Sequence, residues 1–350
     1  PVSGMARWLG VLWHIMRFLP PSLASFSDEK YAAAVGGSLA AADYDLIHFD
    51  IVNMAQYLPL GSRLATIHSP NDATSSIYYR MAENTPWSLA KIRLLVSARL
   101  LQRYERRIYP LFDKVHVVSK EDALYLQGLD GGINVSVIPI AVDEAFLGEP
   151  DLVEAKDGLP SRAPRIVCNG NLGNPVIAKG VQDFLDVALP LIIKQWPFAR
   201  LVVLGQNIDE SLRAQLLEAP NADFLTWVDD YRAFLATADV VLVPDHVGAP
   251  GAKTRTLQAM RLGLPVVGTA TAFAGIPFTN RVHGLAYKTM PECAELISAL
   301  LGDKEIRKAI GANACQLVVD EFSLNVVGPM YEKMYFDTVA NFGARGPAHG

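Results

Sequence analysis

The chain has 350 residues, of which 51% are hydrophobic and 19% are charged, so it is long and apolar enough for two globular domains. Its formal net charge of −5 argues against a general nucleic-acid binder, which normally carries a basic excess. The 3 cysteines form no CxxC or Cys/His cluster, so neither a disulfide framework nor a zinc site is predicted, and a reducing cytoplasm is favoured.

The N-terminal stretch 2–19 is apolar, but Arg7, His14 and Arg17 interrupt it. No apolar run in the chain reaches the roughly 18 to 20 residues of a membrane-spanning helix. Pro20-Pro21 stand where a signal peptide would need small residues for cleavage. Because the chain begins with proline, a native segment ahead of it is a further hypothesis.

Short β-rich runs then alternate with longer helical ones, a pattern typical of parallel sheets with helices on both faces. In the first half this pattern predicts an α/β domain over residues 1–143. Its strands are predicted at residues 45–49, 63–67, 115–118 and 135–138. Its helices are predicted at residues 28–42, 88–109 and 120–128.

The predicted helix 88–109 is strongly basic and has an apolar side. It contains six basic residues and only one acidic residue, Glu105. The basic residues are Lys91, Arg93, Arg99, Arg103, Arg106 and Arg107. Two interpretations stay open for such a helix. It is typical of contact with an anionic membrane surface, and equally typical of an ordinary surface helix with a solvated charged face.

Glycines and prolines punctuate a polar stretch at residues 144–164, which we interpret as a linker. A second α/β domain is predicted over 165–321, followed by a helix over 322–340 that crosses back to the first domain. Strands are predicted at residues 165–168, 200–204, 239–243, 264–268 and 284–287. Helices are predicted at residues 179–195, 210–218, 229–236, 252–262, 291–301, 304–319 and 324–339. Two such domains predict a cleft facing the carboxyl ends of both sheets.

The strongest local signal for a ligand precedes the predicted helix 252–262. Gly251 allows close approach of the backbone to a ligand, and the helix start offers unpaired N–H groups and a positive dipole end. Lys253 and Arg255 add two positive charges, and arginine binds phosphate bidentately. On spacing alone, a phosphate site and an ordinary basic loop fit this segment equally well.

Several ordered motifs resemble those of the GT-B retaining glycosyltransferases of family 4, the glycosyl transferases group 1. Residues 257–269, LQAMRLGLPVVGT, resemble the signature LEAMAxGxPVV, and residues 251–255 resemble a phosphate-side variant that precedes it in one branch of the family. Residues 169–173, NGNLG, resemble the family's glycine-containing loop, and Lys179-Gly180 its KG helix start. The matches are spread over most of the chain.

The resemblance implies two Rossmann-like doubly wound domains that face a central cleft, with the acceptor on the first and the donor on the second. It implies a hexosyltransferase that retains the anomeric configuration and uses a UDP- or GDP-sugar with no metal and no cofactor. The acceptor would be a glycan, a lipid-linked sugar or a small molecule. The implied setting is polysaccharide biosynthesis in the cytoplasm or, as a peripheral membrane protein, on the inner face of the membrane. The family's first strand and Gly-rich loop are not visible in this chain.

Residue roles follow from the same resemblance. Catalytic roles are implied for His68, Lys179 and Lys253. Acceptor or sugar contacts are implied for Asp72 and Ser75. The residues implied to bind the donor are Gly170, Asn171, Gly173, Lys179, Gly251, Lys253, Thr254, Arg255 and Gln258.

The chain departs from the family at its pair of donor-site glutamates. Pro250 stands at the first position and Gln258 at the second, where the family's glutamate binds the ribose. Glutamine accepts one hydrogen bond there but brings no charge. Two alternatives therefore stay open: a non-catalytic nucleotide-sugar-binding protein of the same fold, and a sugar-nucleotide 2-epimerase.

Overall fold

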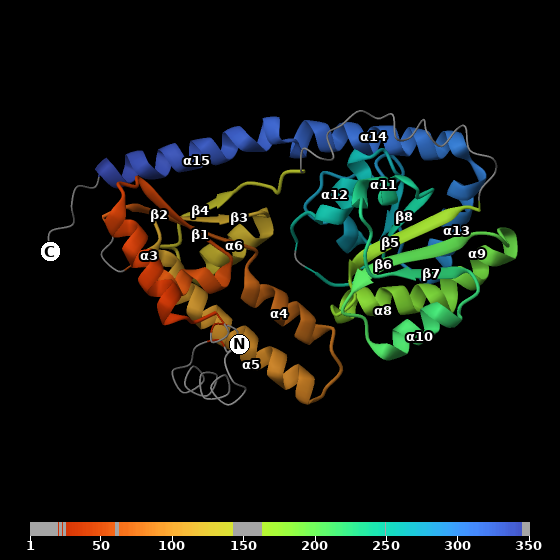
Figure 1. Ribbon diagram of the computed structural model, residues 1–350, viewed down its shortest axis with the longest axis horizontal. Coiled ribbons are helices and arrows are strands. Elements are labelled where there is room, and N and C mark those ends of the chain that lie inside the picture. The colour runs from red at the N-terminus through yellow and green to blue at the C-terminus, as the bar shows by residue number, and fades with distance from the viewer. Residues whose placement is uncertain are drawn as a thin grey trace. The chain divides into compact units, whose positions relative to one another are not determined.

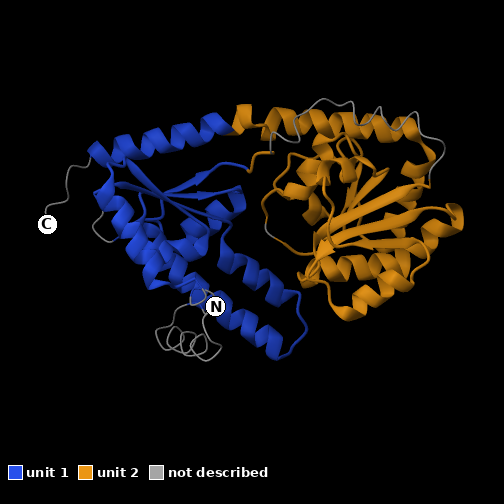
Figure 2. Ribbon diagram, viewed as in Figure 1, with its two compact units in different colours: residues 1–139, 328–350 blue, residues 140–327 orange. Residues whose placement is uncertain are grey.

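The computed structural model describes Pro20, Leu23 and residues 26–59, 63–142, 163–248 and 250–344. The apolar stretch 2–19 lies outside the described residues, and so does the predicted linker 144–164 except for its last two residues. The chain forms two compact units (Figure 2). Unit 1 comprises residues 1–139 and 328–350, and unit 2 comprises residues 140–327.

Unit 1 contains a parallel sheet of four strands in the order β1-β2-β3-β4 (Figure 1). All four were predicted, and each lies within two residues of its predicted start. Ile47 lies beside Thr66 and Val115 beside Val135, while the pairing of β2 with β3 shifts register between His68 and Asn71. Their bounds are β1 (Leu46–Asp50), β2 (Ala65–Asn71), β3 (Lys114–Val117) and β4 (Val135–Val137).

Helices pack against this sheet, and one of them was not predicted. The unpredicted helix is α4, whose buried N-terminus is capped by a residue distant in sequence: Ser75 N donates to Glu105 Oε1 across 2.9 Å. The bounds in unit 1 are α3 (Glu29–Ala41), α4 (Thr74–Glu83), α5 (Leu89–Ile108) and α6 (Lys120–Leu129), with 3₁₀ turns η1 (Val52–Tyr57) and η2 (Tyr109–Leu111).

Unit 2 contains a parallel sheet of six strands in the order β10-β9-β8-β5-β6-β7. The chain runs outward from β5 to β7 and then returns to the other side of β5, so the strand order reverses between β5 and β8. The short strand β7 was not predicted. The bounds are β5 (Arg165–Asn171), β6 (Arg200–Gln206), β7 (Ala222–Leu225), β8 (Val240–Val243), β9 (Val266–Gly268) and β10 (Leu285–Ala286).

The helices of unit 2 cover both faces of this sheet (Figure 1). The helix predicted from Lys179 begins four residues earlier, because Asn174 caps it through Val176 N and Pro175 suits the first helical position. The bounds are α8 (Pro175–Asp183), π-helical η4 (Phe184–Ala188), α9 (Leu189–Gln195), α10 (Glu210–Glu218), α11 (Tyr231–Ala236), α12 (Thr254–Arg261), 3₁₀ turn η5 (Ala270–Phe273), α13 (Met290–Gly302) and α14 (Lys304–Phe322).

The core of unit 2 lies on both faces of its sheet. Ile166 and Cys168 of β5 belong to one buried apolar cluster, and Val167 between them belongs to another on the opposite face. This alternation follows from the two-residue period of a strand, and burial on both faces explains the continuous apolar runs in the sequence. The predicted α/β class with parallel sheets is therefore confirmed.

The last helix, α15 (Leu324–Ala344), begins in unit 2 and continues into unit 1. Met334 and Thr338 are buried along it. Across the residues that the structure describes, no helix combines the length and apolar character needed to cross a membrane.

Candidate functional site

The candidate site lies at the carboxyl edge of the unit 2 sheet, where the strand order reverses between β5 and β8. Open α/β sheets bind ligands at such a reversal, because the loops after the two strands turn to opposite faces and leave a crevice. Here β5 ends at Asn171 and leads to α8, while β8 ends at Val243 and leads through Asp245 to α12.

Arg255 connects the two sides of this crevice. Its guanidinium forms an ion pair with the carboxylate of Asp245, and both side chains are largely buried. The guanidinium also lies over Gly170, since a Cβ added to that glycine would be 2.9 Å from Nη1 of Arg255. The absence of a side chain at residue 170 therefore lets a fixed cation approach the end of β5.

The Asp245–Arg255 pair leaves hydrogen-bonding capacity unused. Among the described residues, neither Oδ1 of Asp245 nor Nε of Arg255 has a hydrogen-bond partner, although both atoms are buried. Buried polar groups are normally satisfied, so these two atoms are suited to hydrogen bonds with a ligand or with water. Because the pair is neutral as a whole, Arg255 contributes an oriented set of donors more than a net positive charge.

Helix α12 begins without a side-chain cap, since its N-cap residue, Lys253, cannot accept a hydrogen bond. Five other helices of unit 2 have one, from Asn174, Asp209, Asp230, Thr289 and Asp303. An uncapped start exposes N–H groups and the positive end of the helix dipole. The Lys253 ammonium donates to the carbonyl of Gly251 across 3.0 Å, so it lies at this helix start.

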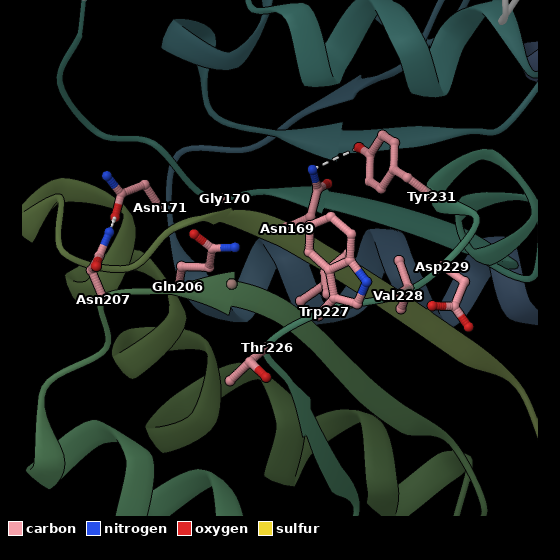
Figure 3. Close-up of a pocket in the computed structure, with 12 residues that line it drawn as sticks. Asn169, Gly170, Asn171, Gln206, Asn207, Thr226, Trp227, Val228, Asp229 and Tyr231 are labelled. Atoms are coloured by element: carbon pink, nitrogen blue, oxygen red, sulfur yellow. Dashed lines mark hydrogen bonds between the residues drawn. The ribbon is translucent and has the colours of Figure 1, made fainter.

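A pocket of about 450 Å³ opens beside Gly170 (Figure 3). Trp227, which is 71% exposed, and Tyr231 contribute aromatic rings, and the Tyr231 hydroxyl accepts from Asn169 Nδ2 across 2.7 Å. The lining residues come from the ends of β5 and β6 and from the segment after β7; they are Asn169, Gly170, Asn171, Leu204, Gly205, Gln206, Asn207, Thr226, Trp227, Val228, Asp229 and Tyr231.

The predicted donor residues fall into two groups that the structure brings together. Gly170, Asn171 and Gly173 lie at the end of β5, where Oδ1 of Asn171 accepts from Gly173 N and from Asn207 Nδ2 across 3.0 and 3.1 Å. The second group lies around the start of α12 and comprises Gly251, Lys253, Thr254, Arg255 and Gln258. Arg255 joins the groups by lying over Gly170.

Lys179 differs from its prediction. It was expected at a helix start, but it is the fifth residue of α8, and its exposed ammonium forms an ion pair with Asp183 one turn later. Its neighbour Gly180 packs directly on Pro244 after β8, so this turn of α8 lies beside the crevice. His246 Nε2 is 3.9 Å from the other oxygen of Asp183.

A catalytic role was implied for His68, but the structure buries its side chain completely in the core of unit 1. The reason is that β2 lies between β1 and β3, and the His68 ring packs between Phe112 and Tyr109, with centroids 4.9 and 4.8 Å away. Nδ1 donates to the carbonyl of Phe49 across 3.1 Å. Burial lowers the pKa of His68 to about 3, so the ring is neutral.

The residues predicted for acceptor contacts lie in unit 1 with His68. Ser75 was expected to contact the acceptor or sugar, but it is fully buried in the first turn of α4, and its hydroxyl donates to the Glu105 carboxylate. Asp72 precedes α4 and is half-buried. Of these three side chains, Ser75 and His68 are engaged inside the unit and do not reach its surface.

Two further sets of residues near the strand ends were not among the predicted site residues. Trp227 and Tyr231 follow the unpredicted strand β7, so no strand end indicated them. In unit 1, Ser69 lies between two histidines: its Oγ is 2.6 Å from His48 Nε2 and 3.0 Å from His116 Nδ1. The alignment of adjacent parallel strands is the only signal that could have placed these three together.

Two α/β units with parallel sheets and a ligand crevice at a strand reversal define the GT-B class of fold, and solved structures agree. Sucrose-phosphate synthase from Thermosynechococcus elongatus superposes with a TM-score of 0.69 at 18% identity, over 89% of this chain and 78% of that one. Anabaena HepE in complex with UDP-glucose superposes with a TM-score of 0.63 at 17% identity, over 89% of this chain and 82% of that one.

Residues 163–303 match the model of the family glycosyl transferases group 1. The phosphatidyl-myo-inositol mannosyltransferase of Mycolicibacterium smegmatis is 24% identical over 319 residues, which cover 88% of this chain and 74% of the relative. The protein of the same name from Mycobacterium tuberculosis is also 24% identical, with 77% of its length covered. The chain is thus an enzyme of the glycosyltransferase type, with a glycosyl transferases group 1 domain in unit 2.

Proposed function

We propose that the chain transfers a hexose from a UDP- or GDP-sugar, bound at the carboxyl edge of unit 2, to an acceptor bound by unit 1. The observation that carries this proposal is the position of Arg255 over Gly170, next to a pocket of about 450 Å³. The pocket is suited in size to a nucleoside, and the donors beside it are suited to a diphosphate. The complex of HepE with UDP-glucose supports a nucleotide-sugar donor.

Each part of the donor has a proposed partner. The base enters the pocket and stacks on Trp227, because a flat exposed ring gains the most from such a contact. The ribose lies near Gln258, as in the family, with a neutral amide in place of the carboxylate. The diphosphate lies at the uncapped start of α12, near Lys253 and Arg255.

In the proposed reaction, the bond from the anomeric carbon to the diphosphate breaks, and a bond from that carbon to an acceptor hydroxyl oxygen forms. The hydroxyl proton leaves with the diphosphate, and the anomeric configuration is retained. Negative charge grows on the leaving diphosphate, and preorganised donors lower the barrier by stabilising it. We propose that Lys253, Arg255 and the N–H groups of α12 provide this stabilisation without a metal, with Lys179 of the adjoining helix as a further cation.

We further propose that the acceptor is a glycan or a lipid-linked molecule in a polysaccharide or glycolipid pathway at the cytoplasmic face of a membrane. Support comes from the relatives, whose names specify phosphatidyl-myo-inositol, a lipid.

The test uses purified full-length protein and a panel of UDP- and GDP-hexoses, with release of UDP or GDP measured in the presence of EDTA. We expect turnover of at least one donor, at a rate that EDTA does not change. Binding of UDP or GDP without turnover of any donor, across lipid and glycan acceptors, would contradict the proposed transfer. A rate that EDTA abolishes and magnesium restores would contradict the metal-free mechanism alone.

A further inference from the structure

The carboxyl ends of β1 and β2 carry two polar side chains that no part of the proposed reaction has used. Open α/β sheets bind ligands at this edge. Here Asp50 is the last residue of β1, and Asn71 is the last residue of β2. Asp50 is exposed and Asn71 is half-buried, whereas His68 and Ser75, the buried residues with an implied role in unit 1, do not reach the surface.

The backbone at both strand ends has an unusual conformation. Ile51, which follows Asp50, has a φ of 60°, and Asn71 has a φ of 68°. A positive φ is rare for a β-branched residue, and such strain persists only where the surrounding structure imposes it. Ile51 N donates to the carbonyl of Ser69 and to Oδ1 of Asp50, both across 2.9 Å. These bonds hold the Asp50 carboxylate in place at the end of β1.

The Asp50 carboxylate keeps most of its hydrogen-bonding capacity. Nδ2 of Asn71 is 3.5 Å from Oδ1 of Asp50, at the outer limit of a hydrogen bond. Within the described ranges of the chain, no group bonds to Oδ2 of Asp50, and no lysine or arginine forms an ion pair with it. A carboxylate accepts several hydrogen bonds, and an amide both donates and accepts. The two side chains are therefore suited to a ligand rich in hydroxyl groups.

Aromatic side chains lie beside Asp50. Burial raises the pKa of Tyr331 and of Tyr335, and the charge of Asp50 raises both further, so the carboxylate lies near both phenols. The two tyrosines are half-buried on α15, which passes along unit 1 (Figure 1). The Tyr335 ring also packs edge-on against His48, with centroids 5.7 Å apart. We call this set the Asp50 site; it comprises His48, Asp50, Asn71, Tyr331 and Tyr335.

We propose that the Asp50 site binds an uncharged sugar ring through neighbouring hydroxyl groups. Asp50 accepts hydrogen bonds from two hydroxyls and stays ionised, and Asn71 donates to a hydroxyl oxygen. An apolar face of the sugar ring packs on Tyr335, since a tyrosine presents an apolar body beside its polar tip. That this sugar is the acceptor rests on the proposed transfer reaction; the binding itself does not.

The charge of the Asp50 site selects against phosphorylated ligands. Asp50 is its one ionised group near neutral pH, because burial lowers the pKa of His48 and raises the pKa of both tyrosines. A phosphate beside the bound hydroxyls would face this carboxylate, and like charges brought together weaken binding. The acceptor is thereby narrowed to a molecule whose accepting end is a neutral polyhydroxyl ring.

The test is saturation-transfer NMR of the full-length protein with the methyl α-glycosides of mannose, glucose and galactose, each with and without a 6-phosphate. We expect at least one neutral glycoside to bind, and its 6-phosphate to bind more weakly. Asp50→Asn keeps the shape of the side chain and its bond to Ile51 N, yet should bind the neutral glycoside at least about tenfold more weakly, because charge-assisted hydrogen bonds are lost.

The same variant should also narrow the difference between the neutral and phosphorylated glycosides, because the repelling charge is gone. A loss of folding would weaken both ligands alike, so this narrowing separates a role in binding from a structural one. Asn71→Gly removes the amide but tolerates the left-handed backbone, and it should weaken binding of the neutral glycoside as well.

Two matched controls accompany these variants. Asp45→Asn removes an exposed carboxylate just ahead of β1, at the other end of the strand. Arg281→Gly places glycine at an exposed residue of unit 2 whose φ is also 68°. Both should bind the glycosides like the unmodified chain. Thermal unfolding is measured for every variant.

Three results would overturn the proposal: no binding of any neutral glycoside, equal binding of the neutral and phosphorylated forms, or unchanged binding by Asp50→Asn. Donor turnover is measured separately, so the two proposals can fail independently. Turnover of a UDP- or GDP-sugar by a chain that binds no glycoside would overturn the Asp50 site alone. Glycoside binding that Asp50→Asn weakens, in a chain that turns over no donor, would support the site and contradict the proposed transfer.

Discussion

The hydroxyl of Tyr335, on the returning helix α15, lies 3.0 Å from Nδ1 of His48 in the middle of β1. This contact is the first in a chain of hydrogen bonds. His116 Nε2 must donate to the carbonyl of Ile138, 2.9 Å away, so its Nδ1 accepts from Ser69. The Ser69 oxygen then accepts from His48 Nε2, which leaves His48 Nδ1 to accept from Tyr335. Burial lowers the pKa of both histidines, which agrees with neutral rings.

Tyr335→Phe should destabilise unit 1 by about 1 kcal/mol, because His48 loses its donor and no other group is supplied. Chemical denaturation of the full chain gives the measurement. Tyr44→Phe, at a tyrosine that is 46% exposed, is the matched control and should be neutral. Equal effects of the two variants would show that the contact between α15 and β1 contributes nothing to stability.

Glu105 should make stability depend on pH. Burial raises its pKa to about 7, and Ser75 only partly offsets this. The folded state therefore binds a proton more tightly than the unfolded state, so this contribution is complete below about pH 4.5 and is lost as pH rises to about 7. The contribution of Glu105 to the free energy of unfolding should therefore fall by up to about 3 kcal/mol as the pH rises.

The neutral rings of His48, His68 and His116 give stability the opposite pH dependence. Their pKa values are lowered in the folded state, so their contribution to stability is present above about pH 6.5 and is lost at lower pH. Denaturation of the unmodified chain and of Glu105→Gln between pH 4.5 and 8 isolates the glutamate. The difference in the free energy of unfolding between the unmodified chain and Glu105→Gln should change with pH over this interval. Glu83→Gln, at an exposed glutamate, is the control, and its difference should stay constant. A constant difference would rule out the raised pKa.

Gly180→Ala should destabilise unit 2 by about 2 kcal/mol or more, because overpacking at a close contact forces the backbone to shift. A Cβ at this position would overlap the carbonyl oxygen of Pro244 and lie 2.8 Å from the Pro244 Cβ. Gly36→Ala in α3 has open space around the added methyl and should stabilise by a few tenths of a kcal/mol to about 1 kcal/mol. A neutral Gly180→Ala would show that α8 does not pack against the end of β8.

Arg255→Gln should weaken UDP or GDP binding by about tenfold or more, equivalent to about 1.4 kcal/mol, measured by titration calorimetry. Arg200→Gln is the control. Arg200 also pairs with an aspartate, Asp223, with an Nη2–Oδ1 distance of 2.6 Å, but it lies at the start of β6, on the opposite edge of the sheet from the site. If both variants bind nucleotide equally well, Arg255 has only a structural role.

Much of the fold could be predicted from the sequence, because most strands carry short apolar runs, and in β5, β6 and β8 of unit 2 these runs are buried. Helix α4 could not, because Glu105 caps it from 30 residues further along the chain. Strand β7 could not, because Asp223 interrupts a segment of four residues and its pairing with β6 alone defines it.

The candidate site was only partly predictable. The two groups around Gly170 and Arg255 could be proposed from the sequence, since glycines and basic residues next to predicted strands and helices are visible there. The ion pairs that engage Arg255 and Lys179 depend on tertiary position and were not visible. The burial of His68 depends on β2 having a strand on each side, and no local pattern around residue 68 specifies that.

Because of helix α15, removing the C-terminal residues of this chain would affect unit 1 as well as unit 2. The partners of His48 and His116 on that helix, Tyr335 and Tyr331, come from the last part of the chain, although the histidines themselves belong to its first part. A protein cut after Val327 would keep every strand of unit 2, yet unit 1 would lose the helix whose tyrosines contact His48 and His116. Unit 1 is therefore made by the two ends of the polypeptide, and a fragment intended to isolate it must carry both.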